Sequence, residues 1–148
     1  EISRAQAAAE GIGSRWRDVA RLVDLGIETS VVKRAVASGR YYREVFVSAH
    51  VNNILVEGFI DLLFENNGGL TLVDYKTDEV DSERADERAK DRYRAQVGIY
   101  ALVVEEATGM EVKEVVLAFL HAKREISFSD LEGLKTWSRS HVVTTAYP

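Results

Sequence analysis

"LTLVDYKTDEV", residues 70–80, has the apolar density of a buried β-strand yet carries an aspartate and a lysine two positions apart. Because side chains alternate between the two faces of a strand, Leu72, Asp74 and Lys76 share one face, and Val73 and Tyr75 share the other. Both faces are largely apolar, so the strand is predicted to be covered on both sides, with a charged pair near its end. A single Asp-x-Lys pair is weak evidence of function, and its meaning depends on partners supplied elsewhere in the chain.

Two further strands are predicted immediately before this stretch. Residues 41–51 ("YYREVFVSAHV") and 54–65 ("ILVEGFIDLLFE") are rich in strand-forming residues. The connections between strands are "NN" and "NNGG", and Asn and Gly tolerate the positive φ angles of hairpin turns. Residues 41–77 are therefore predicted to form a three-stranded antiparallel meander.

The rest of the chain alternates between helical and strand patterns. The order predicts an α/β fold with a central mixed β-sheet flanked by helices, in which the strands before and after the longest helix form a parallel crossover. Helices are predicted at 3–25, 29–38, 81–108 and from Ser129 onward, and strands at 111–122 and 124–128.

Composition excludes several classes of protein. The 148 residues are 46% hydrophobic and 29% charged, as in an ordinary globular domain, and no apolar run approaches the roughly 20 residues that span a bilayer. No membrane association is therefore expected. The chain has no cysteine, which excludes disulfides and cysteine-ligated metal within it and fits a cytoplasmic location. A net charge of −5 gives no general support for nucleic-acid binding, so any such role must rest on a local site.

A second carboxylate is predicted to lie near the Asp74–Lys76 pair. Asp61 stands between Phe59 and Leu63 on one predicted strand face, where an unpaired carboxylate would be costly. The hairpin joining the two strands brings Asp61 close to Asp74 if both face the same way. Two adjacent carboxylates raise each other's pKa and require a counter-charge, and a divalent cation prefers such oxygens.

The predicted helix 81–108 contributes a polar group to the same face of the sheet. Tyr93, Gln96, Val97, Tyr100 and Val104 follow helical spacing, so this stripe should face the sheet. A buried Gln96 must be hydrogen-bonded, and the acidic site or a bound phosphate could be its partner. Each feature alone also fits a structural ion pair or a boundary residue of an amphipathic helix; their joint occurrence favours a functional site.

These motifs carry a family resemblance. "GFIDLL", "LVDYKTD" and "YRAQVGIY" resemble the RecB-like branch of the PD-(D/E)XK nuclease superfamily, as found behind UvrD-type helicase modules in AddA and RecB subunits. The resemblance covers roughly residues 44–122. It implies a restriction-endonuclease-like core and a divalent-metal-dependent deoxyribonuclease, expected to be an exonuclease acting in double-strand-break resection and recombinational repair.

The resemblance also implies roles for individual residues. Asp61 and Asp74 match the metal-ligating acids, and the backbone carbonyl of Tyr75 would complete the protein's share of an Mg²⁺ or Mn²⁺ site. Lys76 matches the catalytic lysine. The DNA-contacting or site-supporting positions implied in this way are Gln96, Tyr100 and, on the first strand, Glu44.

Two departures from the family pattern bear on this expectation. RecB-like nucleases usually carry a histidine ligand upstream of the first strand, but residues 1–43 contain no histidine, and His50, His121 and His141 are expected to be surface or packing residues. The missing ligand either precedes Glu1 in a longer protein or is lost in an impaired site. Some relatives hold an iron–sulfur cluster through four cysteines; none is expected here.

The chain is predicted to be one domain, residues 1–148, and an excised part of a longer helicase–nuclease, because it starts at Glu1 and enters directly into helix-like sequence. It divides into a helical leader (1–40), a catalytic core (41–122) and a C-terminal strand and helix (123–148). Expected partners are DNA, helicase domains of the same chain and a second helicase–nuclease subunit. The alternative is a catalytically silent module that guides DNA or contacts a partner subunit; a small carbohydrate- or phosphate-binding protein is a third, weaker possibility.

Overall fold

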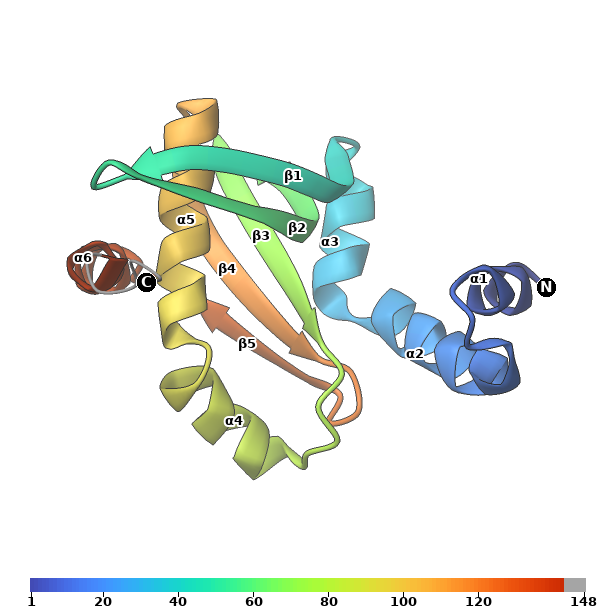
Figure 1. The fold of residues 1–148 in the computed structure, drawn as a ribbon. Helices are drawn as coiled ribbons and strands as arrows, with labels where there is room; N and C mark the ends of the chain where they lie inside the picture. Colours follow the sequence, from blue (N-terminus) through green and yellow to red (C-terminus); the bar gives the residue numbers. More distant parts are fainter. Residues whose placement is uncertain (143–148) are drawn as a thin grey trace.

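The computed structural model describes residues 1–142 and has one five-stranded mixed sheet with helices on both sides (Figure 1). This confirms the predicted fold class. The elements are α1 (Ile2–Ala9), the 3₁₀ turn η1 (Gly13–Arg15), α2 (Trp16–Glu28), α3 (Ser30–Ser38), β1 (Tyr41–Val51), β2 (Ile54–Asn66), β3 (Gly69–Lys76), α4 (Ser82–Asp91), α5 (Arg94–Thr108), β4 (Val112–Phe119), β5 (Arg124–Phe128) and α6 (Glu132–His141).

The sheet has the strand order β1-β2-β3-β4-β5. β1, β2 and β3 form the predicted antiparallel meander, β3 and β4 are parallel, and β5 returns antiparallel to β4. Both hairpin turns use the expected residue types, since Asn52, Asn53, Asn67 and Gly68 all have φ between 50° and 74°. The parallel pair requires a crossover, which α4 and α5 provide.

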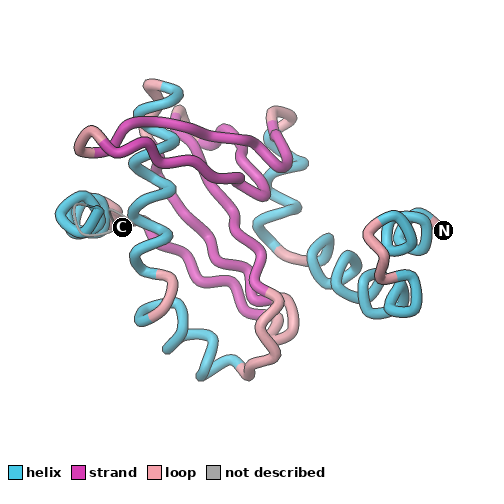
Figure 2. The backbone as a smooth tube through the Cα atoms, viewed as in Figure 1, coloured by secondary structure: helices cyan, strands magenta, loops and turns pink. Residues whose placement is uncertain are grey.

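Two apolar layers enclose the middle of β3, as its two apolar faces predict. On one side Leu72 packs in the larger cluster with Val97 and Val104 of α5. On the other side Val73 packs with Val31 of α3. The backbone view shows α5 and α3 on opposite sides of β3 and β4 (Figure 2). The Asp74–Lys76 end of β3 therefore lies between layers, and its face toward α5 is the one that carries the charged pair.

The alternation of side chains between the two faces of the sheet is interrupted in β2 at Asp61. Ile60 packs in the α5-side cluster and Leu62 in the α3-side cluster, although residues of equal parity share a face in a flat strand. The expectation that Phe59, Asp61 and Leu63 share one face of the strand is therefore wrong, because Phe59 is exposed whereas Leu63 is buried against α5. The hairpin turns away from the sheet and crosses in front of α5 (Figure 1). Consequently β2 leaves β3 at the point where Asp61 stands.

Three predicted helices differ from those observed. The segment 3–25 is interrupted between α1 and α2 by a turn in which Gly11 has φ +73°. The segment 81–108 is two helices, α4 and α5, because Tyr93 has φ −101° and ψ −5° and caps the second one. The last helix begins at Glu132 with Leu131 as its N-cap residue, three residues beyond the predicted Ser129 cap. The predicted ends at Thr29, Gly39, Asp81 and Gly109 are confirmed as helix caps.

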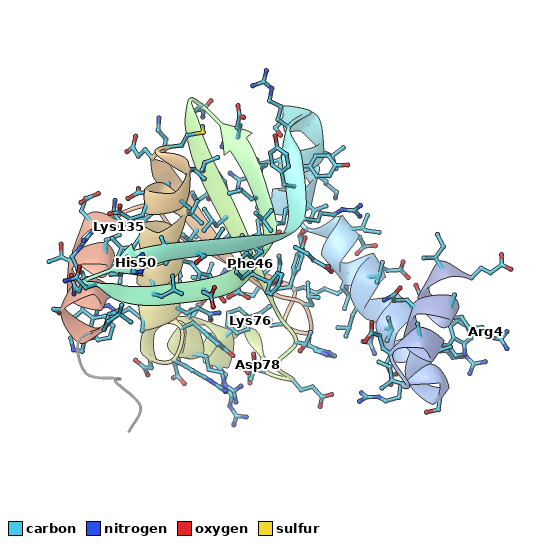
Figure 3. All side chains as sticks on the ribbon, turned by 45° about the horizontal axis from the view of Figure 1, so that its top comes forward. Arg4, Phe46, His50, Lys76, Asp78 and Lys135 are labelled. Atoms are coloured by element: carbon cyan, nitrogen blue, oxygen red, sulfur yellow. The ribbon has the colours of Figure 1, made fainter. Side chains whose placement is uncertain are left out.

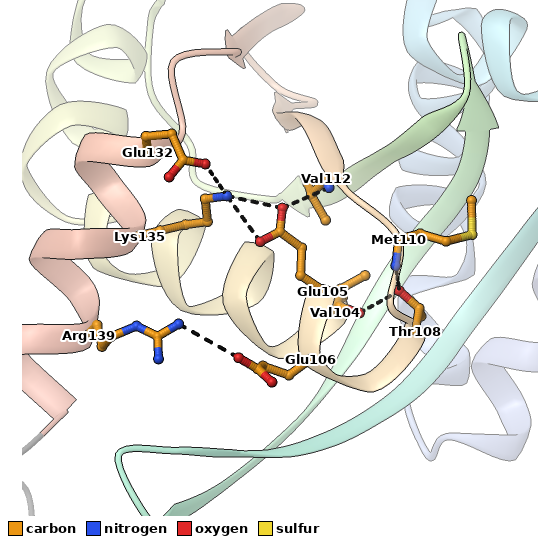
Figure 4. A network of polar contacts seen from close by, with 9 residues as sticks. All are labelled: Val104, Glu105, Glu106, Thr108, Met110, Val112, Glu132, Lys135 and Arg139. Atoms are coloured by element: carbon orange, nitrogen blue, oxygen red, sulfur yellow. Dashed lines mark hydrogen bonds and ion pairs between the residues drawn. The ribbon is translucent and has the colours of Figure 1, made fainter.

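Helix α6 is fixed to α5 by ion pairs and a close backbone approach. Lys135 contacts both Glu105 and Glu132, and Glu105 also accepts a hydrogen bond from the backbone N–H of Val112, which ties the end of the crossover to β4 (Figure 4). None of the helices within residues 1–142 has the length and hydrophobicity needed to cross a bilayer.

Replacing Gly98 with alanine is expected to be strongly destabilising. A Cβ atom there would overlap Ser138 Oγ and lie 2.5 Å from the carbonyl oxygen of Leu134, so α6 would have to move. We expect a loss of about 1–3 kcal/mol in the free energy of unfolding, measured by chemical denaturation. Gly133→Ala, on α6 itself, is the control, because nothing lies within 4 Å of its Cβ position. Equal stability of the two variants would contradict this packing.

Candidate active site

The candidate site lies in the fork where β2 separates from β3. Backbone pairing between these strands ends at Leu62 and Val73, so Asp61 and Asp74 stand opposite each other one position beyond the last pair. Asp61 Oδ2 accepts a hydrogen bond of 2.8 Å from the backbone N–H of Tyr75. The structure therefore brings the two predicted acids together, and Asp61 satisfies a backbone donor that the strand pairing leaves open.

Asp74 is a buried carboxylate whose negative charge is only partly stabilised by its surroundings. It is only 9% exposed, and its Oδ2 atom forms an ion pair with Lys76 Nζ at 2.7 Å. Burial is the main cause that raises its pKa above the ordinary value; the neighbouring Asp61 raises it further, and Lys76 opposes the shift. A divalent cation would stabilise the charged form of a carboxylate that burial and a second carboxylate disfavour in spite of Lys76.

Lys76 connects the acids to α5. Its Nζ atom lies 2.7 Å from Asp74 Oδ2 and donates a hydrogen bond of 2.8 Å to Gln96 Oε1. Gln96 in turn donates from Nε2 to the Tyr100 hydroxyl, at 2.9 Å. The buried glutamine is thus hydrogen-bonded, as its place on the helix predicts, and its partners are a site residue and a helix neighbour. With 9% of its surface exposed, Lys76 is held in one position.

Tyr93 also holds Lys76, and Asp78 holds Tyr93; neither residue was predicted to belong to the site. The Lys76 ammonium lies 3.9 Å from the centroid of the Tyr93 ring, within the range of a cation–π contact. The Tyr93 hydroxyl donates to Asp78 at 2.9 Å, and Asp78 also binds Arg88 of α4. Although burial raises the pKa of Asp78, these hydrogen bonds and the Arg88 charge outweigh burial and lower it overall. The signal for Tyr93 was its place on the same helical stripe as Gln96, of which only Gln96 and Tyr100 were predicted to be site residues.

Tyr93→Leu is expected to lower kcat about 3- to 30-fold for the phosphodiester cleavage that the family resemblance implies, because the ring that positions the Lys76 ammonium is removed. Tyr93→Phe keeps the ring and loses only the contact with Asp78, so it should restore most of kcat. KM should change little in either variant. Equal kcat values for the leucine and phenylalanine variants would contradict a role for the ring.

The other predicted site residues lie around this centre. Glu44 is exposed, has φ +50° and occupies the position opposite Asp61 in the β1–β2 register. Both acids line a groove of about 710 Å³ whose remaining wall is largely apolar and comes from α2, α3 and Tyr75. Tyr75 itself points into this groove, and its side-chain pKa rises to about 12 through burial and the charge of Asp61. The role of its backbone carbonyl stays a prediction.

The three histidines lie elsewhere in the described part of the chain. His50 is exposed on β1, and His121 lines a separate cavity with Glu79 and Asp81. His141 stacks on Trp137 at 4.0 Å between ring centroids. Residues 1–142 contain no group of three or more His, Cys, Asp or Glu side chains placed to hold a metal ion together.

The donor set nevertheless fits a hard divalent cation in part. Asp61 and Asp74 offer two carboxylates, and the Asp74 carboxylate is buried. Mg²⁺ is commonly held by one or two carboxylates together with water and substrate phosphates, so a third protein side chain is not required. Lys76 stands beside Asp74 Oδ2 and would share that oxygen with the ion.

A mixed sheet with two acids and a lysine at a strand fork is the architecture of a restriction-endonuclease-like nuclease. Comparison with known proteins agrees, since the model of the PD-(D/E)XK nuclease superfamily matches residues 2–143. The chain belongs to the PD-(D/E)XK nuclease superfamily.

The relatives found are much longer proteins than this chain. An ATP-dependent helicase/nuclease subunit from Carboxydothermus hydrogenoformans is 41% identical over 91 residues, which cover 62% of this chain and 8% of the relative. The helicase/nuclease subunit of the same name from Bacillus pumilus is 36% identical over 106 residues, 65% of this chain and 9% of the relative. The chain thus spans less than a tenth of their length.

A solved structure from Eubacterium rectale, described as a candidate exonuclease, shares the fold. Its TM-score is 0.59 at 13% identity, over 95% of this chain and 63% of that one.

Proposed function

We propose that this chain is a divalent-metal-dependent DNA nuclease domain of a helicase–nuclease that resects double-strand breaks. The observation that carries the proposal is the cluster of Asp61, Asp74 and Lys76, in which the buried Asp74 carboxylate pairs with the Lys76 ammonium at 2.7 Å beside a second carboxylate. The names of the relatives support DNA as the substrate and helicase domains as neighbours in the same polypeptide. A cytoplasmic location and a second helicase–nuclease subunit belong to the same proposal.

The residues divide the chemistry between them. When bound, Mg²⁺ or Mn²⁺ would supply Lewis acidity and lower the pKa of a water molecule, and Asp61, Asp74 and the Tyr75 carbonyl would hold the ion. Lys76 would donate to the phosphate oxygen on which negative charge develops, or to the attacking water. Gln96 and Tyr93 fix the direction of that ammonium before substrate arrives. Water attacks phosphorus in line, and the bond to the 3′-oxygen breaks to leave 5′-phosphate and 3′-hydroxyl ends.

The alternative, a catalytically silent module, predicts a different arrangement of charge. A silent domain has no physical reason to keep two facing acids and a lysine in a buried fork, because burial of Asp74 destabilises its charged form. Residues 1–43 contain no histidine, and this feature favours the catalytically silent module.

The direct test is incubation of the 148-residue chain with end-labelled single- and double-stranded oligonucleotides in Mn²⁺, Mg²⁺ or a chelator. Metal-dependent products with 5′-phosphate ends are the expected result, and the order of product lengths separates exonuclease from endonuclease action. The proposal fails if none of these metals supports cleavage.

A further inference from the structure

An exposed pair of aromatic rings lies next to the candidate site. Phe46 of β1 and Phe59 of β2 are cross-strand partners, with 5.4 Å between ring centroids and 58° between ring planes. They are 54% and 61% exposed, so both rings keep most of their surface in water. The α5-facing side of the same hairpin is formed by Val45 and Val47 instead. The pair therefore contributes little to the core.

The two rings lie two residues along the hairpin from Asp61 and Glu44, the acids that line the groove. In the β1–β2 register, the position two residues beyond Phe59 is Asp61, and the position two residues before Phe46 is Glu44. Two residues of strand span about 7 Å, so the rings lie within about one nucleotide's length of the carboxylates. Figure 3 labels Phe46 on the β1–β2 hairpin and Lys76 near the end of β3.

We propose that Phe46 and Phe59 form a stacking subsite for an unpaired nucleobase next to the phosphate that is cut. This inference rests on the proposed nuclease function and adds a binding site to it. An exposed aromatic face stacks on any base, which gives affinity without sequence preference. The bases of an intact duplex are stacked on one another and offer no free face, so the subsite favours single strands.

The dimensions of the patch argue for a base over a protein partner. Along this side of the hairpin the two rings are flanked by Ser48 and Glu57 at one end and by Glu44 and Asp61 at the other, so polar residues bound the pair in both directions. A stable protein interface buries about 800 Å² on each partner and has an apolar core. Two rings are far smaller than that and match the face of one base.

The first experiment uses the 148-residue chain carrying Phe59→Trp and a dT₁₀ oligonucleotide, in Ca²⁺ so that strands stay intact. Stacking should quench the new tryptophan on titration, whereas Trp16 and Trp137, at distant points of the fold, report the background in the parent protein. Phe46→Ala and Phe59→Ala should each weaken binding about 5- to 100-fold. Leu55→Ala, an equally exposed apolar residue further along the same hairpin, is the control and should bind normally.

Changes in the protein and in the oligonucleotide test whether the contact is stacking between a ring and a base. Phe59→Leu keeps an apolar side chain and should bind as weakly as Phe59→Ala, whereas a protein-docking surface would tolerate leucine. A single abasic nucleotide should reproduce the loss at one position of the strand, and it should cost nothing further in the alanine variants. Cleavage of DNA without any effect of these changes would overturn the stacking subsite and leave the nuclease proposal intact. Quenching without cleavage would support the subsite and count against the catalytic proposal.

Discussion

Lys76→Met is expected to slow metal-dependent cleavage about 10²- to 10³-fold, which is the typical effect of removing one group that stabilises transition-state charge. Methionine preserves most of the volume of the buried side chain, so packing against Tyr93 and Gln96 should survive. The metal should still bind, because loss of the ammonium frees Asp74 Oδ2 from its ion pair. The measurement is kcat for a labelled oligonucleotide at saturating Mn²⁺, together with Mn²⁺ affinity.

Lys135→Met provides the matched control. Lys135 is also 9% exposed and also paired with carboxylates, Glu105 and Glu132, but it lies on α6 away from the fork. Its replacement should lower thermal stability while leaving kcat per folded molecule unchanged. If the two methionine variants cleave at the same rate, Lys76 has no catalytic role.

Asp74→Asn is expected to abolish cleavage without lowering thermal stability in the presence of a chelator. The pKa of Asp74 is raised in the folded protein, mainly by burial, so the folded state binds a proton more tightly than the unfolded chain. Over the range from the ordinary value of 3.8 up to the raised value, this group makes the protein less stable as pH rises. At neutral pH the charged carboxylate therefore costs stability, and a neutral amide of the same shape avoids that cost.

The pH dependence of the melting temperature tests whether the charged Asp74 carboxylate destabilises the folded protein. The difference in melting temperature between Asp74→Asn and the parent should be zero or positive at about pH 7.5. It should shrink as the pH falls through the raised pKa, where the parent carboxyl also becomes neutral. Asp86→Asn removes an exposed carboxylate paired with Arg124 and should leave cleavage unchanged. A large loss of stability for Asp74→Asn in chelator would mean that Asp74 is a structural ion-pair residue.

The strands and turns around the site could be predicted from local patterns. "LTLVDYKT" has two apolar faces, and the structure covers β3 on both sides. Asn52 and Asn67 occupy turns that need positive φ, and Asn is among the residues that tolerate it. The stripe containing Gln96 correctly predicted that a polar side chain would face the charged end of β3. These inferences succeed because each depends on neighbours close in sequence.

The rest of the site depends on geometry that has no local signal. The change of facing at Asp61 arises from the way the β1–β2 hairpin turns away from β3, and strict alternation cannot show it. The break between α4 and α5 places the Tyr93 ring beneath Lys76 and its hydroxyl on Asp78. Tyr93 belongs equally well to an apolar stripe, so only the three-dimensional arrangement identifies it as a residue that positions Lys76.

The central claim is that Asp61 and Asp74 hold a divalent ion beside Lys76. Calorimetric titration of Mn²⁺ into the parent chain and into Asp74→Ala tests it most directly. We predict one binding event in the parent and an affinity at least about 100-fold weaker in the variant, since even groups that only support a metal ligand contribute about 10- to 100-fold. Equal Mn²⁺ binding by the two proteins, or no binding by the parent, would contradict the assignment of this fork as a metal-dependent active site.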